Sequence, residues 1–270
     1  MYSLTEENSV LSALSPTIAG VLVATVLVAG AVNGIAGFGF ALVGTMVLAT
    51  VVDPATAVVF MIIPILAVNV SLVRDLSATE LRTCGRRFGL LLVSALVGTI
   101  LGMVVLDRLP EAPLRLALGA LSLGFVLNAQ RLVTIPGRER VRDGCFVETP
   151  LGMVGVGGVS GVVFGGTNVG VQLVAYLRSC DLTHGLFVGV VAMVFLGLNG
   201  VRVVLAGALG LYPTLAVFLA SVLAAIPAIV GVFLGKRLRD RVTERYRRAL
   251  VFGLLTVIGL QLVLGGLGVA

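Results

Sequence analysis

Long apolar runs dominate the sequence from residue 16 to its end. A helix needs about 20 apolar residues to cross the hydrocarbon core of a bilayer, and runs of that length recur along the chain. The mean hydropathy is +1.13, 58% of the residues are hydrophobic and only 12% are charged, values outside the range of water-soluble domains. The alternating pattern of membrane β-strands is absent from the sequence. We therefore expect an all-α polytopic membrane protein, with residues 1–270 forming a single membrane domain.

Proline, glycine and charged residues divide the apolar sequence into segments. Two segments, 40–52 and 170–178, are short for a membrane span. Each follows a glycine-rich stretch, NGIAGFG (Asn33 to Gly39) in one case and FGGTNVG (Phe164 to Gly170) in the other. The full set of predicted segments is 16–36, 40–52, 54–73, 88–106, 112–130, 150–165, 170–178, 183–205, 211–235 and 249–268.

Basic residues gather in hydrophilic intervals between these segments, which the positive-inside rule explains better than nucleic-acid binding. Three such intervals, 74–87, 131–142 and 236–248, are predicted to face the cytoplasm. The second and third lie on one side only if the glycine-broken element between them enters and leaves by the same face. We therefore expect each broken element to be a helical hairpin, with the N-terminus and the C-terminus both outside.

The two halves of the chain share a pattern. An offset of 128 residues superposes Asp53 on Asp181, Arg74 on Arg202 and Gly37 on Gly165. The first half, about 16–130, and the second, about 150–268, flank a cytoplasmic linker at about 131–149. The prediction is two inverted-topology repeats, each a glycine-broken helical hairpin plus three transmembrane helices, a plan common among transporters.

The broken segments indicate a binding site. Irregular backbone within a bilayer is tolerated only where protein buries it or where it lines a wet cavity. Helices that begin near Phe40 and Gly170 would converge there, each presenting free N–H groups and about half a positive charge. A buried basic side chain is an expensive alternative, because charge at the bilayer centre costs about 2.5–3.5 kcal/mol. We therefore expect a small anion between the two hairpin tips.

Glycines at the tips allow close approach of the backbone to a ligand, and polar side chains nearby supply hydrogen bonds. The candidate substrate-binding residues are Asn33, Gly37, Gly39, Gly165, Gly166, Thr167, Asn168, Gln172, Asn69 and Asn199. An alternative is that the glycines only pack helices closely and the polar side chains join helix to helix.

Two arginines have two interpretations each, and two aspartates have one. Arg74 and Arg202 are candidates for gating or anion recruitment at the two mouths, or for cations that reach the interface from helix ends. Asp53 and Asp181 precede helices and are expected to be N-caps.

Several classes of activity lack a sequence signal. No cluster of His, Cys, Asp and Glu has metal-ligand spacing, and there is no Walker A sequence. The single histidine has no evident catalytic partner. We expect no metal, no cofactor, no enzymatic activity and no nucleic-acid partner.

Two stretches carry a family resemblance. GVQLVAYL (Gly170 to Leu177) is similar to a GPPLVxYL motif, with Val171 and Gln172 in place of the prolines, and NGVR (Asn199 to Arg202) matches an NxxR pattern. These motifs, together with NGIAGFGFALVGTMVLATVVDPATAVV in the first half, resemble the TauE/SafE sulfite exporter family of membrane transporters.

The resemblance implies export of sulfite, a related sulfur oxyanion or an organosulfonate across the bacterial inner membrane, in agreement with the predicted anion site. A small anionic substrate and the lipid bilayer are then the expected partners, and alternating access is the expected mechanism. An anion channel or a non-transporting anion-binding membrane subunit remain as alternatives.

Overall fold

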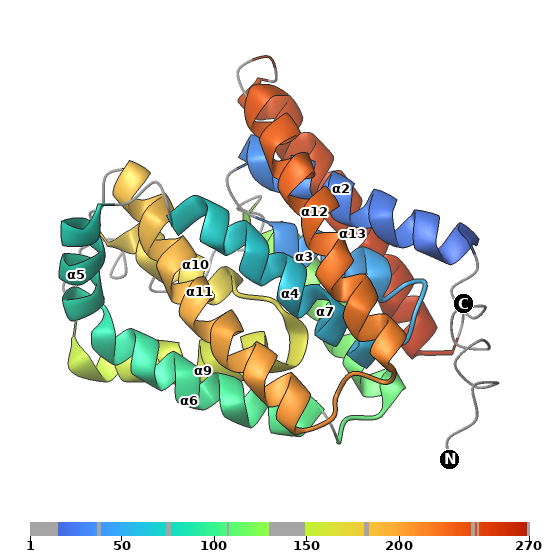
Figure 1. The fold of residues 1–270 in the computed structure, drawn as a ribbon, viewed down its shortest axis with the longest axis horizontal. Helices are drawn as coiled ribbons and strands as arrows, with labels where there is room; N and C mark the ends of the chain where they lie inside the picture. The colour runs from blue at the N-terminus through green and yellow to red at the C-terminus, as the bar shows by residue number, and fades with distance from the viewer. Residues whose placement is uncertain are drawn as a thin grey trace.

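The computed structural model describes residues 16–36, 39–73, 77–106, 108–129, 149–180, 184–238, 241 and 243–268. Over these ranges the chain is helical, and turns join the helices (Figure 1). The helices of the first half are α2 (Pro16–Ala36), α3 (Phe40–Leu48), α4 (Pro54–Val73), α5 (Ala78–Arg87), α6 (Gly89–Leu106) and α7 (Glu111–Ala129). Those of the second half are α9 (Pro150–Thr167), α10 (Val171–Ser179), α11 (His184–Ala208), α12 (Leu215–Leu238) and α13 (Glu244–Gly266).

All ten predicted segments correspond to helices, so the all-helical membrane fold is confirmed for the described residues. The interval 74–87 was wrongly expected to be only a loop, because its residues Ala78–Arg87 form the basic helix α5. The helix within the predicted segment 40–52 is shorter than that segment, since α3 ends at Leu48 and a turn follows. The linker expected at about 131–149 lies outside the described residues except for Thr149.

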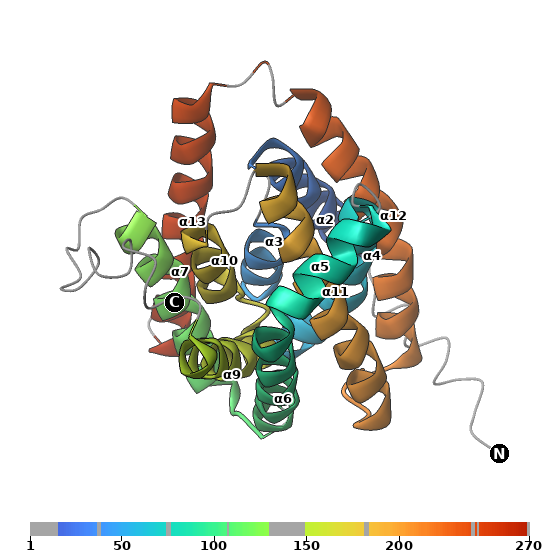
Figure 2. The ribbon, with the colours of Figure 1, turned by 90° about the vertical axis from the view of Figure 1, so that its left-hand side faces the viewer.

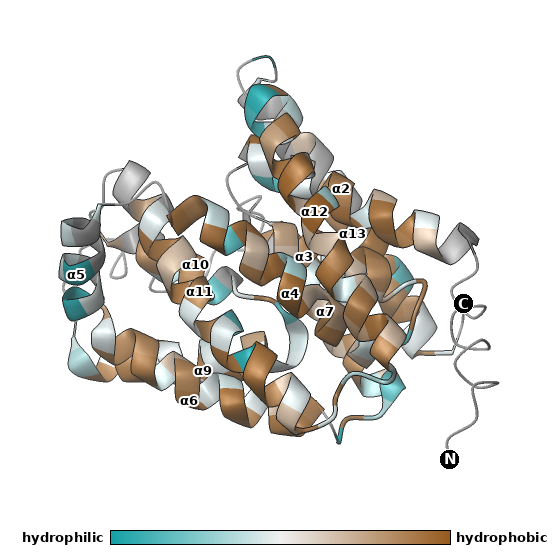
Figure 3. Cartoon of the chain, viewed as in Figure 1, coloured by the Kyte–Doolittle hydropathy of each residue, from teal (hydrophilic) through white to brown (hydrophobic). Residues whose placement is uncertain are grey.

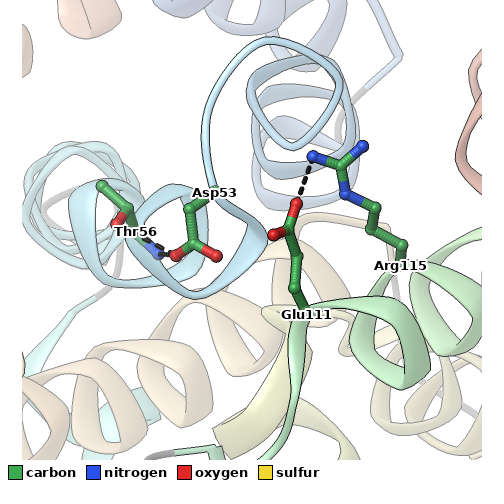
Figure 4. Close-up of polar contacts among 4 residues, drawn as sticks. All are labelled: Asp53, Thr56, Glu111 and Arg115. Atoms are coloured by element: carbon green, nitrogen blue, oxygen red, sulfur yellow. Dashed lines mark hydrogen bonds and ion pairs between the residues drawn. The ribbon is translucent and has the colours of Figure 1, made fainter. Parts of the chain in front are cut away.

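Local chemistry explains several helix ends. The Asp53 carboxylate accepts from the Thr56 backbone N–H at 2.8 Å and from the Thr56 hydroxyl at 3.1 Å, so the predicted N-cap of α4 is confirmed (Figure 4). Thr149 caps α9 by accepting from the Gly152 N–H at 3.2 Å. Proline follows both caps, at the first helical position, where its missing N–H costs nothing. Asp181, the other predicted cap, lies outside the described residues.

The helices are interrupted within both glycine-rich stretches, as predicted. In the second half, however, the break is not at the place that was expected. There Gly165, Gly166 and Thr167 are the last residues of α9, and the break is at Asn168–Gly170, with Asn168 in the left-handed conformation at φ 61°. In the first half, α2 continues through Asn33, and Gly39 stands before α3 with φ 103°.

Five helices in the described part of the chain are long and apolar enough to cross a membrane: α4, α6, α9, α12 and the Gly189–Ala208 part of α11. Apolar colour runs along these helices, while hydrophilic colour gathers on α5 and where α12 leads into α13 (Figure 3). Outward-facing side chains such as Val159 and Val204 are about two-thirds exposed, at 67% and 70%. Such a surface suits lipid rather than water, and the chain is a multi-pass membrane protein.

Two extensive helix interfaces link the halves, α6 with α9 and α2 with α12. Both depend on glycine. A Cβ at Gly161 of α9 would lie 2.2 Å from the Ala95 carbonyl oxygen, and one at Gly231 of α12 would lie 2.2 Å from the Leu27 carbonyl oxygen. The helices therefore approach through glycines spaced four residues apart, the small-residue contact that replaces the hydrophobic effect inside a bilayer. The glycines involved are Gly30 and Gly34 on α2, Gly98 and Gly102 on α6, Gly157, Gly161 and Gly165 on α9, and Gly231 and Gly235 on α12.

The contacts at these glycines also give the relative directions of the helices. Residue numbers rise together across α2–α12 and across α6–α9, so both pairs are parallel. Across α7–α13 they run oppositely, since Gly119 faces Gly259 and Gly266 faces Leu116. These are the directions that the hairpin interpretation requires. The short helices α3 and α10 lie between these pairs (Figure 2).

The glycine contacts yield a stability prediction. Gly161→Ala places a methyl group against the Ala95 carbonyl, so α6 and α9 must separate, and we expect a loss of about 1–3 kcal/mol in the free energy of unfolding. Gly155→Ala on the same helix is the control, because a Cβ there meets nothing within 4 Å. Thermal unfolding in detergent measures both. Equal melting temperatures for the two variants would contradict this account of the interface.

Candidate anion site

A fully buried arginine lies at the tip of the second hairpin. Arg202 belongs to α11 and has 0% exposure. Its Nη1 donates to the side-chain oxygen of Asn168, and also to that of Asn199 at 3.4 Å, while Nη2 donates to the Gly165 carbonyl at 3.2 Å. The guanidinium carbon lies 4.9 Å from the centre of the Phe164 ring, which is cation–π distance. The break between α9 and α10 therefore surrounds a cation.

This placement corrects one interpretation of Arg202. It is not a cation that reaches the interface from the end of α11, because the guanidinium is inside the protein beside the broken segment. A role in gating or anion recruitment stays a prediction. The argument that helix N-termini make a buried basic residue unnecessary was also wrong. Carbonyls in the last turn of a helix lack intrahelical partners and carry partial negative charge, so the end of α9 receives the arginine. Arg74, its predicted counterpart, lies outside the described residues.

In the part of the chain that the structure describes, the cation has no carboxylate beside it. Arg202 makes no ion pair with the described residues, and its Nε is buried without a hydrogen-bond partner. No charged residue occurs in the sequences of α4, α6 and α9, which pack against or bond to this part of α11. A buried charge balanced only by neutral groups is costly, so the arrangement is suited to an anion supplied from outside the chain.

Asn168 joins this cation to the first half of the chain. Its side-chain oxygen accepts from Arg202, while its nitrogen donates to the Thr45 hydroxyl at 2.9 Å and to the Val58 carbonyl at 2.8 Å. One side chain thus links α9 and α11 to α3 and α4. It reaches both sides because its left-handed backbone turns the chain out of α9, a conformation that Asn adopts more readily than most residues.

Thr167 and the glycines before it have local partners. The Thr167 hydroxyl donates to the Val163 carbonyl at 2.5 Å and accepts from the Val169 N–H at 3.2 Å. A Cβ at Gly165 would lie 2.4 Å from the Thr99 carbonyl oxygen, and one at Gly166 would lie 3.4 Å from the Gly102 carbonyl oxygen. The helix-packing alternative therefore accounts for Gly165, whose carbonyl in addition binds Arg202.

Two further predicted residues lie near the same break, Gln172 in the sequence and Asn199 through its contact with Arg202. Gln172 is in the first turn of α10, and its side-chain oxygen is buried without a hydrogen-bond partner. Asn199, one turn before Arg202, donates to the Phe195 carbonyl at 2.8 Å and accepts from the arginine. Arg202 and Asn199 together are the NxxR pattern of the sequence.

In the first half, the predicted residues are arranged differently. Asn33 lies within α2 and its side-chain oxygen accepts from the Phe40 N–H at 3.4 Å, so it serves the start of α3. Gly39 has open space where a Cβ would stand, and Gly37 lies outside the described residues. Asn69 is buried in α4 and makes no side-chain hydrogen bond to the described residues. Within the described residues, Asn69 therefore is not joined to Arg202.

The meeting of two helix N-termini stays a prediction. The contact that joins the second tip to α3 is to Thr45, in the second turn of that helix rather than at its first residue. Val169, between the tip and α10, packs in the same apolar core as Phe40 and Val43.

Sequence reasoning missed Tyr212 and Thr99. Tyr212, in the turn between α11 and α12, lies within electrostatic reach of Arg202, and its buried hydroxyl makes no hydrogen bond of standard geometry. Ser221 lies beside the Tyr212 hydroxyl but donates to the Phe60 carbonyl at 2.6 Å. That carbonyl has no partner within α4, because Pro64, four residues later, lacks an N–H. The Thr99 hydroxyl, on α6, is likewise buried without a partner. Thr99 was visible as a polar residue in an apolar helix, whereas Tyr212 had no signal.

A second polar contact lies away from this arginine. Arg115 pairs with Glu111 at 2.5 Å, one turn apart on α7, near the turn that leads to Asp53 (Figure 4). Because Arg115 already has a carboxylate partner, it lacks the uncompensated charge of Arg202.

The comparisons with known proteins bear on the whole chain. The family model described as Sulfite exporter TauE/SafE matches residues 22–262 of the 270. No curated protein matches, and no solved structure matches. The matched region includes both glycine-rich breaks and every residue described above as bonding to Arg202. The chain belongs to the sulfite exporter TauE/SafE family, which are membrane transporters of sulfur anions rather than enzymes.

Proposed function

We propose that this chain exports a small sulfur oxyanion, sulfite by preference, across the bacterial inner membrane by alternating access, and that the anion binds at Arg202. The observation that carries the proposal is the fully buried guanidinium, which has no carboxylate partner among the described residues. Binding an anion there satisfies a charge that the fold already holds out of water.

Neighbouring groups favour the same ligand. The N-cap residue of α10 is Gly170, which has no side chain to cap the helix, so the first N–H groups of α10 receive no side-chain acceptor from it. The Arg202 Nε is a further donor without a partner. An oxyanion with several oxygens accepts from donors of both kinds at once. Gln172, in the first turn of α10, and Thr167, Gly166, Asn33 and Gly39 remain proposed contacts of the tips.

Alternating access is favoured by the way the halves interlock. The first apolar helix of each half packs against the fourth apolar helix of the other, α2 with α12 and α9 with α6, when the basic helix α5 is left out of the count. Exchanging the halves thus converts one glycine interface into the other, as expected for inverted repeats of about 16–130 and 150–268. Such symmetry gives two arrangements of similar energy, one open to each side. With this inverted order we also propose that both chain termini lie outside.

A channel fits the buried arginine less well. A continuous aqueous pore through this site would wet the guanidinium, yet Arg202 has no exposed surface. The described arrangement corresponds to an occluded state, in which the tip must move before an anion enters or leaves.

The charge of Arg202 is the first test. Arg202→Gln removes the charge and keeps neutral donors, so we expect the loss of about 2–5 kcal/mol of anion binding, and sulfite flux close to that of empty liposomes. Arg202→Lys keeps the charge without the planar donors and should retain partial flux. The measurement is uptake of radiolabelled sulfite by proteoliposomes over a concentration series.

Arg237→Gln is the matched control, because Arg237 is an exposed arginine in the last turn of α12, stacked on Phe233. It should transport like the unmodified chain. Wild-type flux in Arg202→Gln, with both variants monodisperse in detergent, would rule out this site. Flux that rises linearly with concentration would favour a channel, and binding without flux would favour a non-transporting subunit.

Asn168 is the second test, since it joins the two halves. Asn168→Gly keeps the left-handed backbone accessible but deletes hydrogen bonds to Arg202, Thr45 and Val58. We expect the free energy of unfolding to fall by about 2–4 kcal/mol, because one of these bonds is to a charged group. Chemical denaturation in detergent measures it.

Asn69→Ala is the control for that variant, since Asn69 is a buried asparagine that makes no side-chain hydrogen bond to the described residues. A smaller loss is expected there. If the glycine variant unfolds at the same denaturant concentration as the unmodified chain, Asn168 does not hold the halves together.

A further inference from the structure

We infer that the transported species carries a single negative charge, so that hydrogensulfite or a simple monosulfonate is bound and a dianion such as sulfate or sulfoacetate is rejected. The inference rests on the proposed function and deepens it, because it fixes the charge class of the ligand at Arg202. It follows from a count of the charges that face the guanidinium.

The helices around Arg202 contribute no second full charge. α4, α6 and α9 contain no Asp, Glu, Lys, Arg or His in their sequences. On α11 itself, His184 is the first residue and lies five turns from Arg202. Arg178 is the last but one residue of α10, about 10 Å along the helix from its start. The basic residues of α5, which also packs against α11, include the exposed Arg82, Arg86 and Arg87.

The helix ends at the break cancel one another. The end of α9 carries about half a negative charge and directs the Gly165 carbonyl to Arg202. The start of α10 carries about half a positive charge, three residues further along the chain. Their sum is close to zero, so among the described residues Arg202 leaves a net charge of about one positive unit at the tip.

The remaining donors are neutral. Tyr212 is the titratable group within electrostatic reach of Arg202 among the described residues, and its hydroxyl is buried without a partner. Burial raises the pKa of Tyr212 above its usual value, so the phenol keeps its proton at neutral pH and donates. Thr99 is also neutral, and its hydroxyl also lacks a partner. Neither group adds to the charge balance.

A dianion at such a site leaves one negative charge unbalanced in a medium of low dielectric. Water would have stabilised that charge far better, so the penalty falls on the dianion alone. A monoanion, by contrast, forms a neutral pair with the guanidinium. We expect a preference of about tenfold or more for monoanions of similar size.

Competition in proteoliposomes tests this with the full chain. Uptake of radiolabelled sulfite is measured with methanesulfonate, a monoanion, or with sulfate and sulfoacetate, both dianions, as competitors at one pH. Methanesulfonate should compete at concentrations at least about tenfold below those of either dianion. Equal or stronger competition by sulfate or sulfoacetate overturns the inference.

A pH series supplies a second readout. As the pH rises, hydrogensulfite loses its proton, so the apparent affinity for total sulfite should fall in proportion to the hydrogensulfite fraction. Methanesulfonate does not titrate in this range, and its inhibition constant should stay unchanged, which separates titration of the ligand from titration of the protein. Apparent sulfite affinity that is constant or rises with pH overturns the inference.

Tyr212→Phe checks the charge count. It removes a neutral donor, so the affinity for methanesulfonate should fall severalfold while the ratio between methanesulfonate and sulfate stays the same. A lost preference in this variant would show that the charge count at Arg202 is wrong. Failure of the proposed function looks different, because no anion of either class would then show saturable flux.

Discussion

The hydrogen bonds between Arg202 and the tip of the second hairpin are the interaction on which the centre of this structure depends. A cation in this position has no carboxylate beside it within the described residues, and it is held by two amide oxygens, a terminal helix carbonyl and an aromatic face. The break after α9 is what supplies that carbonyl and the left-handed asparagine. An unbroken helix through 164–177 would have used the same carbonyl for its own hydrogen bonding, so the irregular backbone and the buried charge require each other.

Packing inside the bilayer places this arrangement. Apolar side chains gain nothing by leaving lipid for protein, so the close contacts have to come from shape. Glycines at intervals of four residues provide it where α6 meets α9 and where α2 meets α12, and Gly165 has a role in packing and another at the site. Its missing side chain lets α9 lie against Thr99 of α6, and its carbonyl binds the arginine. The same residue thereby fixes the depth of the tip relative to α6.

Hydropathy and charge were sufficient to predict the helices of this chain, because a membrane span must be apolar over a nearly fixed length. They failed at α5, which was expected to be only a basic interval between spans, since a short polar helix contains no long apolar run. The break was predicted from Gly165 and Gly166, yet those glycines are helical, and Asn168 is where the chain leaves the helix. Sequence shows that glycines are present, but whether they bend a helix or pack it depends on the neighbour they face.

The role of Arg202 was not predictable for a different reason. Insertion costs per residue treat a charge as isolated, and on that basis a buried arginine looks too expensive. Here several weak interactions stabilise one cation together. The guanidinium contacts the Gly165 carbonyl in the last turn of α9, two amide oxygens and the face of Phe164. Those groups stabilise the cation without neutralising it, whereas an aspartate in the place of Asn168 would have satisfied it permanently. A neutral amide leaves the charge for a ligand and still ties the tip to Thr45 and Val58. In the proposed function, an incoming anion competes for the arginine with the side chain that connects the two halves, and this competition is the proposed coupling between binding and movement of the tip.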